Sequence, residues 1–173
     1  MTIARCLPLL ALPLFLAATI PAHAGGTGEI GWLNWNQGIS EAAITHRPIV
    51  VDVYTDWCGW CKRMDRDVYA RDDVRDYVSR HFVPVRLNAE SVEEARYEDR
   101  PYTERALAQR FRVSGYPTTI FLKSDGAHIA NVPGYLPAER FKLLLRYIGE
   151  DQIGRGVSWP DFEKSAAADR PGR

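Results

Sequence analysis

Residues 49–62 read IVVDVYTDWCGWCK, an apolar β-branched run followed at once by two cysteines three positions apart. The run Ile49–Tyr54 has the length and composition of a buried strand, and one carboxylate, Asp52, interrupts it. The third cysteine of the chain lies in an N-terminal segment that we expect to be removed. Cys58 and Cys61 then form a thiol pair with no other thiol to bond, which indicates reversible redox chemistry.

The spacing of the two cysteines suits thiol-disulfide exchange. Residues at i and i+3 share one face of a helical turn, so one sulfur can attack a mixed disulfide held on the other. If Cys58 begins a helix, free backbone N–H groups and the positive end of the helix dipole stabilise its thiolate. We therefore predict an exposed, acidic Cys58 that attacks first and a more buried Cys61 that attacks second.

A cysteine pair has two other common roles. As a structural staple it would close a four-residue loop, for which chain entropy gives only about 2 kcal/mol before ring strain is subtracted. As part of a zinc site it would need two further ligands, but His46, His81 and His128 stand singly and form no H-x(3–5)-H pair. The sequence predicts no metal site, and both roles remain alternatives.

The N-terminus has the pattern of an export signal. Arg5 gives a short positive start, residues 6–20 carry no charge, and Ala22-His23-Ala24 forms a small-x-small cleavage site. We predict a cleaved signal peptide over residues 1–24 and a periplasmic mature protein, in a compartment where disulfides persist. A retained membrane anchor is the alternative, but it needs about 20 apolar residues, and this run is shorter and contains two prolines.

Composition indicates one globular domain without a nucleic-acid partner. About 149 of the 173 residues remain after the predicted cleavage, enough for one hydrophobic core. The 22 basic and 22 acidic residues balance, which favours neither nucleic acid nor an anionic membrane surface as partner. We predict a monomer with a domain over residues 25–150 and a C-terminal extension over 151–173. The extension is expected to be disordered from about Ala166, because it has nothing to bury there.

Hydrophobic periodicity and turn residues predict alternating strands and helices. The predicted strands cover residues 49–54, 82–87, 118–122 and 128–132, and the predicted helices cover residues 32–45, 58–69, 72–80 and 137–148. Asp72 or Asp73 is expected to cap the third helix. The strand-helix-strand order implies a parallel pair, and Ser124-Asp125-Gly126 predicts a hairpin. The charged segment Ser91–Arg112 is expected to form loop and a solvated helix.

The order of elements and four motifs resemble the thioredoxin fold. Trp57 directly before the first cysteine, Lys62 directly after the second, the turn Val113–Thr118 and Gly134 match the thioredoxin pattern, over about residues 32–149. The resemblance implies an α/β thioredoxin fold, with a central mixed β-sheet flanked by helices.

Residues 54–62, with Asp73-Val74 and residues 82–85, more specifically resemble the periplasmic reducing domain of the transmembrane thiol-disulfide interchange protein. This resemblance implies a protein-disulfide reductase that receives electrons from a membrane donor, acts on protein thiols and disulfides, and needs no cofactor. Thioredoxins carry proline where Trp60 stands, so the direction of electron flow is not implied. A disulfide oxidase or isomerase is an alternative enzyme, and a client-binding or assembly module is the alternative without catalysis.

The resemblance also assigns roles to residues around the cysteines. Asp52, desolvated on its strand, would have a raised pKa and take the proton of Cys61; a carboxylate merely bonded to a neighbouring hydroxyl is the alternative. Tyr116 and Pro117 would form a cis peptide bond beside the cysteines, leaving the Tyr116 backbone free to pair with an extended substrate.

Three residues beside the predicted nucleophile complete the predicted substrate-binding site. Trp57, Gly59 and Trp60 flank Cys58, and the two indoles would form an apolar rim that docks a peptide. Packing in the core is the alternative for Trp57.

Overall fold

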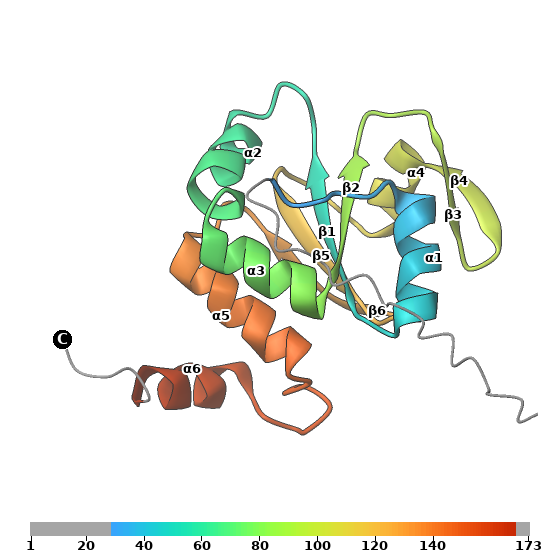
Figure 1. Ribbon diagram of the computed structural model, residues 1–173. Coiled ribbons are helices and arrows are strands. Elements are labelled where there is room, and N and C mark those ends of the chain that lie inside the picture. The colour runs from blue at the N-terminus through green and yellow to red at the C-terminus, as the bar shows by residue number, and fades with distance from the viewer. Residues whose placement is uncertain (1–28, 169–173) are drawn as a thin grey trace, which may run out of the picture.

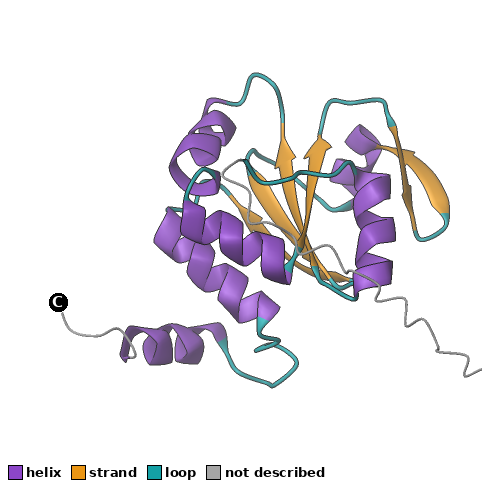
Figure 2. Cartoon of the chain, in the orientation of Figure 1, coloured by secondary structure: helices purple, strands orange, loops and turns teal. Residues whose placement is uncertain are grey.

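The computed structural model describes residues 29–168 and has a central four-stranded sheet with helices on both faces (Figures 1 and 2). The strands are β1 (Ile49–Tyr54), β2 (Val83–Asn88), β3 (Glu94–Tyr97), β4 (Arg100–Thr103), β5 (Thr118–Leu122) and β6 (His128–Pro133). The helices are α1 (Trp35–Thr45), α2 (Gly59–Met64), α3 (Asp72–His81), α4 (Glu104–Arg110), α5 (Ala138–Gly149) and α6 (Trp159–Ala168). A π-helical turn, η1 (Asp65–Tyr69), continues directly from α2.

Strand β1 lies in the middle of the sheet, in the order β2-β1-β5-β6. It pairs in parallel with β2 and antiparallel with β5, and β5 forms an antiparallel hairpin with β6. The predicted parallel pair, hairpin and mixed sheet are confirmed. Because neighbours cover both edges and helices cover both faces, Ile49 to Val53 are all buried, which explains their nearly continuous apolar sequence.

Alternation along β1 divides the core into two layers. Ile49, Val51 and Val53 point to the layer that contains α1 and α4. Val50 belongs to the opposite layer, with side chains from α2, η1, α3 and α5. Asp52 has the parity of Val50, so the single carboxylate of the strand faces the layer of the cysteine-bearing helix.

The charged segment after β2 forms a β-hairpin, so the prediction of loop and helix is wrong for residues 94–103. Strands β3 and β4 pair through a two-residue turn, Glu98-Asp99, whose φ angles are both positive, as in a type I′ turn. The side chain of Asn36 in α1 pairs with the edge of β3: its Nδ2 donates to the Glu94 carbonyl at 2.9 Å, and its Oδ1 accepts from the Arg96 amide at 2.8 Å. The hairpin is thereby fixed to α1 (Figure 1).

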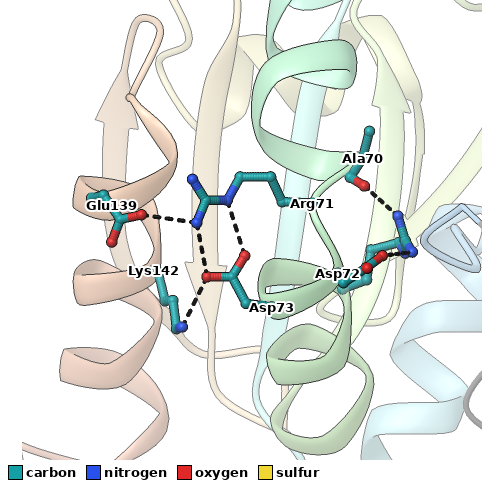
Figure 3. Close-up of polar contacts among 7 residues, drawn as sticks. Ala70, Arg71, Asp72, Asp73, Glu139 and Lys142 are labelled. Carbon is teal, nitrogen blue, oxygen red and sulfur yellow. Dashed lines mark hydrogen bonds and ion pairs between the residues drawn. The ribbon is translucent and has the colours of Figure 1, made fainter.

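Helix α3 begins at Asp72, so its N-cap lies one residue before the predicted ones. Arg71 is the N-cap residue, and Asp72 and Asp73 occupy the first turn, so the prediction that one of them caps the helix is wrong. Asp73 instead accepts hydrogen bonds from Arg71 at 3.0 Å and from Lys142 of α5 at 2.9 Å, and Arg71 also pairs with Glu139 (Figure 3). These donors, Arg71 first, hold the pKa of Asp73 well below its usual value, and the cluster joins α3 to α5.

The C-terminal extension folds back on α5 as α6. The rings of Trp159 and Phe162 lie 5.2 and 5.3 Å from the ring of Tyr147, and Arg140 pairs with Glu163 at 2.9 Å. Ala166 is buried in the last turn of α6. The prediction of disorder from about Ala166 is therefore wrong as far as Ala168.

None of the helices between residues 29 and 168 combines the length and apolar character needed to cross a lipid bilayer. The predicted signal peptide, residues 1–24, and the last five residues lie outside the described part of the chain.

Gly38 allows α1 to approach β2 closely, which makes it a sensitive test of the packing. A methyl group at Gly38 would overlap the Cγ2 methyl of Val85. We expect Gly38→Ala to lower the free energy of unfolding by about 1–3 kcal/mol through overpacking, although alanine favours the helix by about 1 kcal/mol. Denaturant titration of the disulfide-bonded protein measures this change.

The compensating substitution is Val85→Ala, which makes room for the added methyl group. The double variant should lose less free energy of unfolding than the two single variants lose together. Gly31→Ala is the control, since a methyl group there has no atom within 4 Å. A neutral Gly38→Ala variant would contradict the close α1–β2 packing.

Candidate active site

The candidate active site lies where β1 and β2 end and β5 begins. The last residues of β1 and β2, Tyr54 and Asn88, are register partners, and Val53 of β1 is opposite Thr118, the first residue of β5. The loops that leave β1 and β2 and the turn that enters β5 therefore meet at one edge of the sheet. Functional residues often gather on such loops because the sheet holds them rigidly.

Cys58 and Cys61 form a disulfide at the start of α2. Cys58 is the N-cap residue, its amide donates to the Thr55 carbonyl at 3.1 Å, and its Sγ accepts from the Cys61 amide at 3.0 Å. The N–H of the first helical turn thus points at the sulfur of Cys58, where it would stabilise a thiolate after reduction.

Both cysteines are buried in this oxidised state, with 3% of Cys58 and 5% of Cys61 exposed. The prediction of an exposed Cys58 above a more buried Cys61 is wrong for the disulfide-bonded form. The physical reason is that the N-cap sulfur turns inward over the first turn, toward the Cys61 amide.

Two exposed indoles flank the disulfide. Trp57 is 66% exposed and Trp60 is 54% exposed, so the core alternative for Trp57 does not hold. The Trp57 ring lies edge-on to Tyr116 at 6.0 Å, and the Trp60 ring lies 5.6 Å from Tyr135. Gly59 between the indoles is also exposed and has open space around its Cα.

The turn before β5 contributes the remaining predicted site residues. The Tyr116–Pro117 peptide bond is cis. Pro117 is buried, its carbonyl accepts from the Gly134 amide at 2.8 Å, and Tyr116 is half-buried against Trp57. The structure thus brings Tyr116, Pro117 and the cysteine segment to the same edge of the sheet.

Asp52 is buried below this edge, with 2% of its surface exposed. The hydroxyl of Tyr69 donates to Oδ1 of Asp52 at 3.2 Å. Nε of Arg86 lies 3.3 Å from Oδ2, an ion pair without aligned hydrogen-bond geometry. Arg86 also pairs with Asp65, so η1 and β2 both supply partners to the carboxylate.

Burial raises the pKa of Asp52 to about 6, and the positive charge of Arg86 limits the rise. The negative charge of Asp65 adds to the rise, while the Tyr69 hydroxyl opposes it. Burial also raises the pKa of Tyr69 well above its usual value, so that hydroxyl stays protonated and remains a donor. A carboxyl group with a pKa near neutrality can exchange protons with a thiol.

Solvent approaches these partners through a cavity of about 590 Å³ lined by Trp32, Asp65, Tyr69 and Arg86, among others. The sequence analysis missed Tyr69, Arg86 and Tyr135. A signal existed for Arg86 alone, since it is the one charged residue of the strand predicted to pair with the Asp52 strand; the structure places the two residues in register. Within residues 29–168 no group of three or more His, Cys, Asp or Glu side chains could hold a metal ion.

A family model described as a thioredoxin-like domain matches residues 35–149, and the chain belongs to this family. The resemblance inferred from the sequence is confirmed. The chain is 29% identical over 109 residues to the thiol:disulfide interchange protein DsbD of Pectobacterium atrosepticum and 32% identical over 116 residues to DsbD of Ralstonia nicotianae. These alignments cover 62% and 64% of the chain but only 17% of each relative.

Among solved structures, a thioredoxin-fold protein from Helicobacter pylori matches with a TM-score of 0.63. The match covers 72% of this chain and 82% of that chain at 23% identity, a likeness that shows the fold alone.

The raised pKa of Asp52 predicts a specific pH dependence of stability. Between about pH 4 and pH 6 the folded protein holds a proton at Asp52 that the unfolded chain has lost, so stability falls as the pH rises through this window. A pKa raised from 3.8 to about 6 corresponds to about 3 kcal/mol of lost stability once the group ionises. We expect Asp52→Asn, which keeps an acceptor for Tyr69, to be more stable than the parent at pH 8 and not at pH 4.

Denaturant titrations of the oxidised proteins at the two pH values measure this difference. Asp76→Asn is the matched control, because it makes the same substitution at an exposed position of α3. An unchanged pH dependence in Asp52→Asn would show that Asp52 does not titrate in this window.

Proposed function

We propose that this member of the thioredoxin-like domain family is a protein-disulfide reductase, with Cys58 as the nucleophile and Cys61 as the resolving thiol. The observation that carries the proposal is the position of Cys58 at the N-cap of α2, with its sulfur accepting the Cys61 amide N–H. That position favours a thiolate in the reduced protein. A structural staple would have no need of two exposed indoles beside the pair.

The proposed reaction exchanges one disulfide for another. The Cys58 thiolate attacks one sulfur of the partner disulfide, and the other partner sulfur leaves as a thiolate that takes up a proton. The Cys61 thiolate then attacks the Cys58 sulfur, and the second partner sulfur leaves as a thiol. Two electrons and two protons pass to the partner, and the Cys58–Cys61 disulfide is left to be reduced by a donor dithiol.

Asp52 is proposed to take the proton of Cys61 at the resolving step. Its position on the cysteine-facing side of β1 and its pKa of about 6 support this role. The cavity beside Tyr69 and Arg86 brings solvent to the groups that contact Asp52, so the proton could return to bulk water on that side.

The partner is proposed to dock on the exposed face formed by Trp57, Gly59 and Trp60, beside Tyr116 and Pro117. Exposed tryptophans next to a reactive group supply apolar contact area at low cost in side-chain entropy. The backbone of Tyr116 would pair with an extended segment of the partner, in the manner of a strand added to a sheet edge.

The protein is further proposed to act as a monomer in the periplasm, after cleavage of residues 1–24, and to receive electrons from a membrane donor. The charge-free N-terminal run and its small-x-small end support export. The relatives named thiol:disulfide interchange protein support a thiol-disulfide donor and protein thiols as partners.

Reductase and oxidase roles differ in redox potential. A reductase should have a potential well below the poise of its compartment, whereas an oxidase or isomerase should lie near or above it. Equilibration of the Cys58–Cys61 pair with glutathione buffers, followed by tryptophan fluorescence, gives the potential. A value near that of a strong oxidant would replace the reductase proposal with the oxidase one.

The nucleophile assignment predicts different outcomes for the two cysteines. With dithiothreitol as donor, the protein lacking residues 1–24 should reduce insulin disulfides, and Cys58→Ala should abolish this activity. Cys61→Ser should retain attack but lose resolution, so stable mixed disulfides accumulate on Cys58. Non-reducing electrophoresis and mass spectrometry of the adduct check both outcomes.

Full activity in Cys58→Ala would overturn the assignment of the nucleophile. Client binding that survives in Cys58→Ser, in a protein that shows no turnover, would favour a binding module instead.

A further inference from the structure

The loop over residues 89–93 continues from β2 and lies against the end of β1. Its Ala89 amide donates to the Tyr54 carbonyl at 2.9 Å, which extends the β1–β2 pairing one residue past the end of β2. One residue further, Oε1 of Glu90 accepts from Nε1 of Trp57 at 3.0 Å. A carboxylate from outside the cysteine motif therefore holds the indole that precedes Cys58.

Helix α4 fixes this loop in place. Nη2 of Arg105 donates to the Glu90 carbonyl at 2.8 Å, and the Arg105 amide donates to the Ser91 carbonyl at 3.1 Å. The buried carboxylate of Glu104 accepts from the Asn88 amide at 3.2 Å. The Glu90 amide in turn donates to Oδ1 of Asn88 at 3.0 Å. The backbone of Glu90 is therefore held at both its amide and its carbonyl group.

The β3–β4 hairpin connects this loop to α4. Thr103, the last residue of β4, is the N-cap of α4, and its Oγ1 accepts from the Ala106 amide at 3.1 Å. The hairpin is fixed to α1 through Asn36, so the position of Glu104 and Arg105 is set by the hairpin. The charged segment that had no role in the sequence analysis therefore determines where Glu90 lies.

The two ends of the exposed face differ in charge, because Arg63 at the Trp60 end forms an ion pair with Asp67 at 3.1 Å while the carboxylates at the Trp57 end form none within the described residues. Asp56 and Glu90 adjoin Trp57, and among residues 29–168 neither carboxylate forms an ion pair. At the other end, the guanidinium of Arg63 lies 5.1 Å from the ring centre of Trp60 and 5.3 Å from that of Tyr135. A partner that crosses Cys58 toward the Trp57 end meets negative charge.

We infer that Glu90 is a specificity-determining residue, which holds Trp57 in place and favours oxidised partner polypeptides that carry Lys or Arg beside the reacting cystine. This inference rests on the proposed disulfide reductase function. The occupant follows from charge complementarity. Arg105 bonds the backbone carbonyl of Glu90 rather than its carboxylate, and the carboxylates of Glu90 and Asp56 form no ion pair in the described part of the chain, so a basic side chain of the partner can pair with them beside Trp57.

Three cystine peptides that are identical except for Lys, Ala or Glu next to one cysteine test the inference. With dithiothreitol as donor, the parent protein should show a kcat/KM about fivefold higher for the Lys peptide than for the Glu peptide, as expected for an exposed charge pair. The difference should lie in KM and should shrink in 0.5 M salt.

Glu90→Gln separates the charge from the hydrogen bond, because its amide oxygen still accepts from Trp57. It should turn over the Ala peptide at the parent rate and lose the preference for Lys over Glu. Glu98→Gln, at the far tip of the hairpin, removes the same charge and should keep the preference.

Equal rates on the Lys and Glu peptides in the parent protein, or an unchanged preference in Glu90→Gln, would overturn the inference. The Ala peptide keeps this failure distinct from failure of the proposed function. If the parent protein reduces the Ala peptide but does not discriminate between the Lys and Glu peptides, only the role of Glu90 is refuted. If it reduces none of the three peptides, the proposed reductase function is refuted.

Discussion

The double pairing of β1 is the constraint on which the site depends. Parallel pairing with β2 brings the ends of these two strands together, and antiparallel pairing with β5 brings the start of that strand to the same edge. The three connections at this edge carry the cysteines, Glu90 and the Tyr116-Pro117 turn. A shift of β1 by one residue against its neighbours would also turn Asp52 toward the opposite layer, so the same pairing sets both the proposed docking face and the buried carboxylate.

Asp52 shows how the fold tolerates a group that opposes its own stability. Its burial disfavours the charged form, and the partners Tyr69 and Arg86 only partly offset that effect. A well-packed apolar residue at this position of β1 would stabilise the strand. This cost supports the proposed role of Asp52, because a pKa near neutrality would let the carboxyl group accept a thiol proton and release it again.

Sequence patterns were informative where local and tertiary preferences agree. The apolar run of β1, the cysteine spacing and the turn before β5 predicted the sheet and the edge at which the site lies. The β3–β4 hairpin was missed because its turn is Glu98-Asp99, without the glycine or asparagine that usually marks two positive φ angles. Tyr69 was missed because a π-helical turn, rather than a regular helix, directs its hydroxyl to Asp52.

The residues of the proposed reaction and the residue proposed to select partners lie on different elements. Asp52 lies on β1, and Cys58 and Cys61 lie at the start of α2, so their geometry follows from strand parity and a helix N-terminus. Glu90 lies on a loop whose position is set by the hairpin and α4. Neither the hairpin nor α4 carries a residue of the proposed reaction. Since the hairpin touches neither sulfur nor Asp52 through any of its described hydrogen bonds, its sequence can vary while the redox centre is kept. On the proposed function, partner choice can then change at Glu90 and Trp57 without disturbing the thiol pair, because specificity and reaction depend on different contacts.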